Sequence, residues 1–295
     1  MLKIYQKPEI QELKSDFLTQ KKVQLFIKRE DLIHPHVSGN KWRKLKYNLE
    51  EAKKQGHHTL LTFGGAYSNH IYATAAAAKE AGFKSIGIIR GEEHLPLNHT
   101  LSFAQEQGMQ LSYMDRSTYR LKKEADVIQR LRDQFGEFFL VPEGGTNNLA
   151  IQGCEEIIDD QVKSFDIVCS AVGTGGTISG IIAGMKGNAK IIGFSSLKGN
   201  FLTDEVKQLL SGYQCDFQNW EIINDYHFGG YAKVKPELMA FINDFKKDYH
   251  IQLEPIYTGK MMYGLFDMIS KNLFEENSRI LAIHTGGLQG LKGFE

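Results

Sequence analysis

Apolar and polar residues alternate along this chain in two recurring patterns. Short apolar runs with strand character are separated by stretches in which apolar residues recur every three or four positions. In the first such unit, Val23, Leu25 and Ile27 occupy every second position, and a helical pattern over 41–55 follows and ends at Gly56. Strands separated by helices of ten or more residues predict an α/β fold, with parallel twisted sheets flanked by helices.

The same alternation predicts most of the remaining elements. Further strands are expected at 59–63, 84–90, 110–114, 138–141, 166–172, 190–195 and 279–284. Further helices are expected at 68–81, 100–107, 119–135, 149–158, 177–185 and 260–271. Residues 211–235 show no clear period, and their turn-forming residues favour loops.

Composition and charge narrow the class of protein. A length of 295 residues favours one or two domains, and 42% hydrophobic residues with 29 glycines fit a globular α/β protein with many tight turns. Lys and Arg together number 35, as do Asp and Glu, so the net charge is zero and favours neither nucleic acid nor an anionic membrane as a partner. We also see no apolar run of about 18 residues and no secretory signal.

Cysteine usage indicates a reducing compartment. Cys154, Cys169 and Cys215 are widely spaced, odd in number and form no CxxC pair, so neither a disulfide framework nor a thiolate zinc site is expected. Cys169 lies in an apolar run that reads as a buried strand, where a packed thiol is expected rather than a nucleophile. We therefore expect a cytoplasmic protein.

Four glycine-rich turns follow predicted strands, where open α/β sheets bind ligands; they cover 64–69, 144–147, 173–177 and 285–287. The third turn, Gly173, Thr174, Gly175, Gly176 and Thr177, is the best phosphate cradle, because its glycines let backbone N–H groups approach an anion at a helix start. A dinucleotide fingerprint and a P-loop both need glycine five residues after Gly173, where this chain has Ile178, so neither motif is present. The alternative is a tight turn that binds nothing.

One lysine stands at a loop–helix junction. Lys41 follows Gly39 and Asn40, and Lys44 lies one helical turn further on. A reactive amine together with a phosphate cradle suggests pyridoxal phosphate held covalently by a lysine. The alternative is a solvated surface charge.

The remaining polar motifs have simple structural explanations. Ser68 or Asn69 is expected to cap the helix that begins there, with His70 as a packing partner. The histidine pairs at 34–36 and 57–58 lack carboxylate or thiol partners at ligand spacing, so we expect no metal site.

Seven motifs in order along the chain resemble those of the fold type II pyridoxal-phosphate enzymes. More narrowly, they are similar to the 1-aminocyclopropane-1-carboxylate deaminase/D-cysteine desulfhydrase family, and they cover Lys28–Leu32, Ser38–Leu45, Gly65–His70, Glu143–Asn147, Gly173–Thr177, Tyr257–Lys260 and His284–Gly287. The resemblance implies pyridoxal 5'-phosphate as the cofactor, a small amino acid as the substrate, and a homodimer. It also implies two domains with the cofactor between them: a large cofactor-binding domain (1–44 and 142–295) and a small domain (45–141).

The resemblance assigns roles to residues. Lys41 would bind the cofactor covalently and act as a catalytic base, with Ser68 at the substrate carboxylate and Tyr257 stacked near the substrate. Asn69 would bond the cofactor's ring oxygen, and Thr285 would face its pyridine nitrogen. The Gly173–Thr177 turn would hold the phosphate, helped by Lys44.

Two positions favour one activity within this family. Deaminases carry glutamate directly after the tyrosine and leucine in the final glycine turn, whereas this chain has Thr258 and Thr285. A hydroxyl leaves the ring nitrogen neutral and weakens the electron sink, which suits elimination of a good leaving group such as thiolate. The expected activity is therefore D-cysteine desulfhydrase, an α,β-elimination that gives pyruvate, ammonia and sulfide.

Three alternatives stay open. They are deamination of 1-aminocyclopropane-1-carboxylate, elimination from another small amino acid such as serine or chloroalanine, and a binding protein without turnover. Lys41 argues against the last, since a scaffold needs no reactive amine. Trp42, where the family has a smaller residue, and the 228–233 loop, which does not match the family's tyrosine-bearing loop, bear on the choice of substrate.

Overall fold

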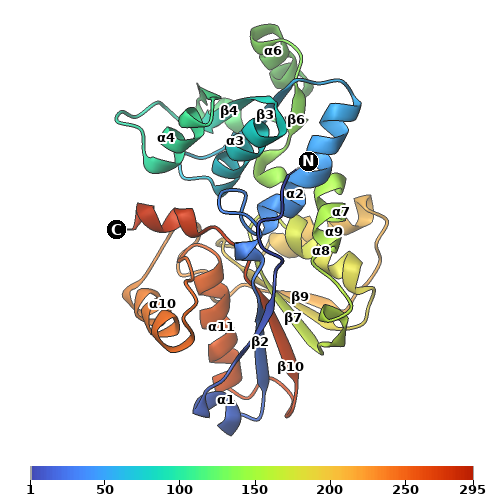
Figure 1. Cartoon of the computed structure of the whole chain (residues 1–295), viewed down its shortest axis with the longest axis vertical. Coiled ribbons are helices and arrows are strands. Elements are labelled where there is room, and N and C mark those ends of the chain that lie inside the picture. The colour runs from blue at the N-terminus through green and yellow to red at the C-terminus, as the bar shows by residue number, and fades with distance from the viewer. Residues whose placement is uncertain (1, 295) are drawn as a thin grey trace.

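The computed structural model describes residues 2–294 and arranges the strands in two separate sheets (Figure 1). The six-stranded sheet has the order β1 (Ile10–Leu13), β2 (Gln24–Lys28), β10 (Arg279–Ile283), β7 (Ile167–Val172), β8 (Lys190–Ser195) and β9 (Trp220–Ile223). The four-stranded sheet has the order β5 (Met109–Met114), β4 (Lys84–Arg90), β3 (Thr59–Gly64) and β6 (Phe139–Val141).

The strands pair in parallel in both sheets, with the exception of β1, which runs antiparallel to β2 at one edge. The helices are α1 (Asp16–Gln20), α2 (Asn40–Lys54), α3 (Asn69–Ala81), α4 (His99–Glu106), α5 (Arg116–Arg120), α6 (Ala125–Phe135), α7 (Asn148–Glu155), α8 (Gly176–Met185), α9 (Leu202–Gly212), α10 (Pro236–Tyr249) and α11 (Thr258–Ser270). The predicted α/β class with parallel, helix-flanked sheets is confirmed.

The larger sheet is covered on both faces, which explains why its central strand is a continuous apolar run. Every residue of β7 is buried. Because side chains alternate across a strand, Cys169 packs with the α10 and α11 side, while Val168 packs with the α8 and α9 side. Apolar burial on two faces therefore fixes the place of β7 inside the sheet.

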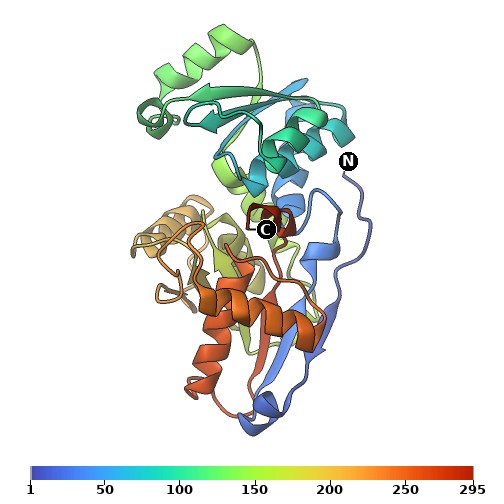
Figure 2. The same ribbon diagram turned by 90° about the vertical axis from the view of Figure 1, so that its left-hand side faces the viewer.

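The smaller sheet is built in the same way. Leu60 of β3 belongs to a core shared with α2 and α3, and its neighbour Leu61 belongs to a core shared with α6 on the other face. Figure 2 shows the two sheets at opposite ends of the molecule, with the final turn, η4 (Leu288–Gly293), between them. The four strands of this sheet fall within 45–141, and the division into two domains at 44/45 and 141/142 stays a prediction.

Between the sheets, α2 packs against α7. The approach is close: a Cβ atom on Gly153 of α7 would lie 2.0 Å from the backbone oxygen of Arg43. Arg43 is also held by Glu30, whose carboxylate oxygens lie 3.0 and 3.1 Å from two guanidinium nitrogens. These contacts fix the N-terminal part of α2.

One predicted helix is wrong as a single element. Residues 119–135 were expected to form one helix, but the chain forms α5, turns at 121–124, and continues in α6. Asp115 caps α5, and Tyr119 is drawn into the core against Phe63, with its hydroxyl 2.8 Å from Glu143. The side-chain contacts of Tyr119 therefore set the direction of α5 independently of α6. The unassigned segment 211–235 contains β9, which sequence reasoning missed.

In the part of the chain that the structure describes, no helix combines the length and the apolar character needed to cross a membrane.

Candidate active site

A cavity of about 330 Å³ lies where the carboxyl ends of strands from both sheets meet. Gly65 follows β3, Glu143 follows β6, Gly173 follows β7, and Thr285 follows β10 closely. The site-residue predictions converge here, since the lining includes Lys41, Lys44, Ser68, Asn69, Tyr257, Thr285, Gly173, Thr174, Gly175 and Thr177. Gly176 belongs to the same turn without lining the cavity.

The Gly173–Thr177 turn forms an anion cradle. Gly175 is the N-cap of α8 with φ +80°, and no side chain caps this helix, so its first backbone N–H groups are free to bind an anion at the positive end of the helix dipole. A Cβ atom on Gly176 would lie 2.9 Å from Thr146 and 3.1 Å from the amine of Lys44. The glycines are thus required by close packing and by backbone conformation.

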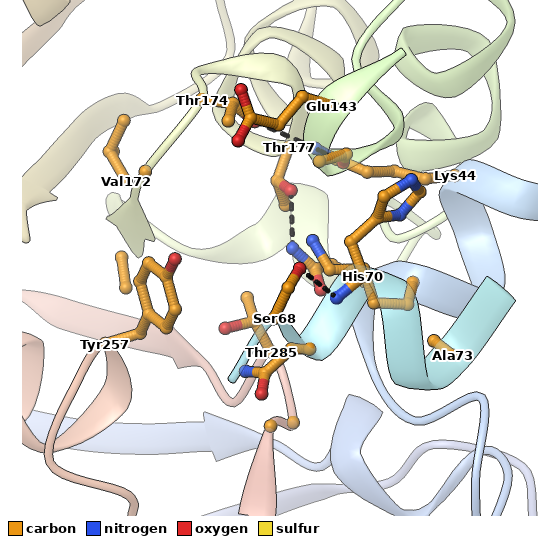
Figure 3. Close-up of a pocket in the computed structure, with 18 of the residues that line it drawn as sticks. Lys44, Ser68, His70, Ala73, Glu143, Val172, Thr174, Thr177, Tyr257 and Thr285 are labelled. Carbon is orange, nitrogen blue, oxygen red and sulfur yellow. Dashed lines mark hydrogen bonds between the residues drawn. The ribbon is translucent and has the colours of Figure 1, made fainter. Parts of the chain in front are cut away.

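Lys44 ties the cradle to the neighbouring turn. Its buried Nζ donates to the backbone oxygen of Gly144 at 3.0 Å and to the hydroxyls of Thr146 and Thr174 at 3.1 and 3.4 Å. Figure 3 shows Lys44, Thr174 and Glu143 on the same side of the cavity. Burial lowers the pKa of Lys44 to about 8. Lys44 is therefore fixed as part of the wall of the cradle.

Lys41 lies in the first turn of α2, which is anchored on both sides. Gly39 has φ +61°, and a Cβ atom there would lie 2.0 Å from the backbone oxygen of Thr285. Asn40 donates its backbone N–H to that same oxygen at 3.2 Å, and its Nδ2 to the hydroxyl of Thr177 at 2.8 Å. The start of α2 is thereby attached both to the cradle and to the turn after β10.

The amine of Lys41 is suited to act as a nucleophile. Its side chain is partly buried and lines the cavity, and we find no hydrogen-bond acceptor for Nζ within residues 2–294. Burial, followed by the nearby charge of Lys44, lowers the pKa of Lys41 to about 7. A large fraction of the amine is therefore neutral near pH 7, which is the form that attacks a carbonyl.

Ser68 and Asn69 stand at the start of α3. Ser68 caps the helix as expected, because its hydroxyl accepts from the backbone N–H groups of His70 at 3.2 Å and Ile71 at 3.3 Å. The side-chain oxygen of Asn69 accepts from Gln289 at 2.6 Å. Both residues also line the cavity, so their capping role does not remove them from it.

His70 packs below the cradle, as expected for a structural histidine. Its Nε2 lies 2.7 Å from the hydroxyl of Thr62, which donates to the backbone oxygen of Val141. Burial, followed by the charges of Lys41 and Lys44, holds the pKa of His70 well below its usual value, so the ring is neutral.

Tyr257 faces a second tyrosine that sequence reasoning could not place. The rings of Tyr257 and Tyr231 meet edge to face with centroids 6.2 Å apart, and both line the cavity. The buried amine of Lys260 holds the turn before Tyr231, donating to the backbone oxygens of His227 at 2.9 Å and Gly230 at 2.7 Å. The paired glycines directly before Tyr231, both with positive φ, are the sequence signal that could have located it.

The two threonines that favoured one activity have different positions. Thr285 lines the cavity and is 7% exposed. Thr258 is fully buried outside the lining, where its hydroxyl donates to the carboxylate of Glu254 at 3.2 Å. That carboxylate also accepts three backbone N–H groups at the start of α11, so Glu254 serves as a helix cap, and burial raises its pKa.

Sequence reasoning also missed other lining residues. Ser38, Asn40 and Glu143 lie inside the matched motifs but had no role assigned to them, whereas no motif marks His36, Arg90, Leu197 or Gln289.

The residues present fit the cofactor that the sequence suggested. An uncapped helix start with required glycines fits a phosphate, and an unpaired, partly neutral amine in the same cavity fits an aldehyde.

Comparisons with known proteins agree with this geometry. A family described as "Pyridoxal-phosphate dependent enzyme" matches residues 9–286. A Pyrococcus abyssi protein, provisionally named 1-aminocyclopropane-1-carboxylate deaminase, is 33% identical over 91% of this chain and 86% of its own. A mitochondrial protein of Arabidopsis thaliana, named bifunctional D-cysteine desulfhydrase/1-aminocyclopropane-1-carboxylate deaminase, is 32% identical over 91% of this chain and 73% of its own.

Among solved structures, one described as an ACC deaminase homologue superposes with a TM-score of 0.82 and 29% identity, covering 98% of this chain and 92% of that one. The cradle, the amine and the matched motifs together establish that this chain belongs to the family of pyridoxal-phosphate dependent enzymes, in the group of the 1-aminocyclopropane-1-carboxylate deaminases and D-cysteine desulfhydrases.

Proposed function

We propose that this enzyme catalyses α,β-elimination on a small amino acid, with D-cysteine as the preferred substrate. The observation that carries the proposal is the presence of the Lys41 amine and the Gly173–Thr177 cradle in one cavity, with the hydroxyl-bearing Thr285 also in its wall. The Arabidopsis relative, whose name includes both activities, is consistent with elimination on D-cysteine.

The cofactor would be held by groups that the cavity already presents. The backbone N–H groups at the start of α8 would bind its phosphate, and Lys41 would bind it covalently. The amide of Asn69 would contact its ring oxygen, and Thr285 its pyridine nitrogen. When bound, pyridoxal phosphate supplies an electron sink for the negative charge at the substrate's Cα.

The protein's own side chains would bind the substrate and move its protons. The Lys41 amine would remove the proton from the substrate's Cα, because its lowered pKa leaves it able to accept a proton near pH 7. Ser68, at the start of α3, contacts the substrate's carboxylate. Tyr257 and Tyr231 line the cavity together and would orient the leaving group.

The substrate preference is tested by comparing two substrates. We expect a higher kcat/KM for D-cysteine than for 1-aminocyclopropane-1-carboxylate, because the hydroxyl of Thr285 cannot hold the pyridine nitrogen protonated and a weaker sink favours a good leaving group. Initial rates of pyruvate or 2-oxobutanoate release decide it, with L-cysteine and D-serine measured alongside. A higher value for the cyclopropane substrate would reverse the assignment and favour a deaminase.

Thr285→Val tests the neutral partner of the ring nitrogen. We expect turnover to fall by about fivefold while the cofactor stays bound, because one hydrogen bond worth about 1 kcal/mol is lost and the volume is kept. The absorption of the bound cofactor and the rate of sulfide release measure the two effects separately. Thr258→Val is the matched control: it removes a buried hydroxyl outside the cavity and should affect stability more than turnover.

A binding protein without turnover is the alternative from another class. A visible absorption band without keto-acid release from any of these amino acids would favour it. We also propose a cytoplasmic location, which cysteine usage favours, and a homodimer, which the family resemblance implies.

A further inference from the structure

Arg90, the last residue of β4, is a third cationic side chain in the lining of the cavity, after Lys41 and Lys44. Because β4 pairs in parallel with β3, with Ile89 opposite Gly64, Arg90 emerges beside the turn that begins at Gly65. A Cβ atom on Gly65 would lie 3.8 Å from a terminal nitrogen of the Arg90 guanidinium. The guanidinium therefore lies against the turn that leads to Ser68 and Asn69.

The other charged groups of the cavity wall already have partners or roles. Lys44 is held by three oxygens of the neighbouring turns, and Lys41 is the candidate for covalent attachment. Glu143, the carboxylate of the lining, accepts from the hydroxyl of Tyr119 at 2.8 Å and pairs with Lys122 at 3.1 Å.

Arg90 itself has no carboxylate within 4.0 Å of its guanidinium among residues 2–294. Its positive charge is thus not neutralised by the protein where it meets the cavity.

The position of Arg90 separates it from the phosphate cradle. The cradle meets the four-stranded sheet at the turn after β6, where a Cβ atom on Gly144 would lie 2.8 Å from Thr174, whereas Arg90 ends β4, which β3 separates from β6. An anion bound near Arg90 is therefore a different group from the cofactor's phosphate. In an enzyme acting on amino acids, the second anion to be bound is the substrate's carboxylate, which Ser68 of the Gly65–Asn69 turn beside Arg90 is proposed to contact.

We propose that Arg90 recognises the α-carboxylate of the substrate, acting with the Gly65–Asn69 turn. A guanidinium donates two parallel hydrogen bonds to a carboxylate, but it cannot do so to a neutral amide or ester. Arg90 is thus a specificity-determining residue that restricts the enzyme to amino acids with a free carboxylate. This inference rests on the proposed function, since it takes an amino acid as the substrate.

The test measures the Kd of alanine and of alaninamide, both enantiomers of each, for Arg90→Gln and for the unmodified holoenzyme. Binding is monitored by the change in the cofactor's visible spectrum. Alanine has no leaving group at Cβ, so the binding measurement is separate from elimination. We expect Arg90→Gln to raise the Kd of alanine by about tenfold or more, the size of effect for a hydrogen bond to a charged group. The Kd of alaninamide should stay unchanged, and Arg90→Lys should fall between the two proteins.

Arg116→Gln is the matched control. Arg116 and Arg90 are both exposed. Arg116 lies next to Gly91, with its Nε 3.9 Å from the position of a Cβ atom there, but it does not line the cavity. Three results would overturn the proposal. Arg90→Gln could lose equal affinity for alanine and alaninamide, it could lose no affinity at all, or Arg116→Gln could lose the same affinity for alanine. So would an unmodified holoenzyme that binds alanine no more tightly than alaninamide.

The same experiment keeps the two proposals apart. If the unmodified holoenzyme releases no sulfide from D-cysteine, the proposed function fails, while the comparison of alanine with alaninamide still decides the role of Arg90.

Discussion

Lys41→Ala is expected to remove covalent cofactor attachment and nearly all turnover. The amine is placed in the cavity by an anchored helix start, and its loss takes away both the attachment point and the base, a proton-transfer contribution of about 10²- to 10⁴-fold by itself. Borohydride reduction of the unmodified enzyme, followed by peptide mapping, should place the reduced adduct on Lys41. An adduct on Lys44 or Lys260 would contradict the assignment.

Lys46→Ala is the matched control for that prediction. Lys46 lies in the same helix, but its amine pairs with Glu156 outside the cavity, so this variant should keep the colour and the activity.

The pH dependence of reconstitution with the cofactor is a further test of Lys41. With a pKa of about 7 for Lys41, coloured adduct should form faster as the pH rises from about 6 and level off above about 8. A rate that keeps rising towards pH 10 would indicate an ordinary, solvated lysine.

Gly175→Asp is expected to give a folded protein that binds no cofactor. A carboxylate at the N-cap of α8 would add a negative charge at the helix start where the phosphate must bind, and the two like charges would repel each other. Cofactor content per chain and the visible spectrum measure the outcome, with circular dichroism to show that the fold persists.

Gly175→Ala separates charge from strain. Gly175 has φ +80°, and a Cβ atom would lie 3.0 Å from Leu209 and 3.1 Å from Val206, so any side chain strains this position. Alanine introduces the strain without the charge, and this variant should keep measurable cofactor. If both variants bind cofactor as well as the unmodified protein does, the phosphate is held elsewhere.

Local patterns were sufficient for most of the elements. The strands at 84–90 and 190–195 were predicted with the bounds that the structure has, because each is a short apolar run between turn residues. The prediction of a single helix over 119–135 was wrong because the bend at 121–124 depends on contacts of Tyr119 with Phe63 and Glu143. Both of these residues are distant from Tyr119 in the sequence.

The sequence by itself determined the fold class, the family and the cofactor of this protein. Strand–helix alternation reflects local burial, and Gly175 of the Gly173–Thr177 turn is needed for a local backbone conformation with positive φ, so both are visible in a linear pattern.

Only the tertiary structure decided how the side chains are combined in the site. Thr258 and Thr285 look equivalent in sequence, yet one hydroxyl is bonded to a helix-capping carboxylate and the other lines the cavity. Arg90 carries no motif, and its place beside Gly65 follows from the pairing of β3 with β4. The reason is physical: burial, pKa and the presence or absence of a charge partner depend on neighbours that are distant in sequence, and folding alone brings them together.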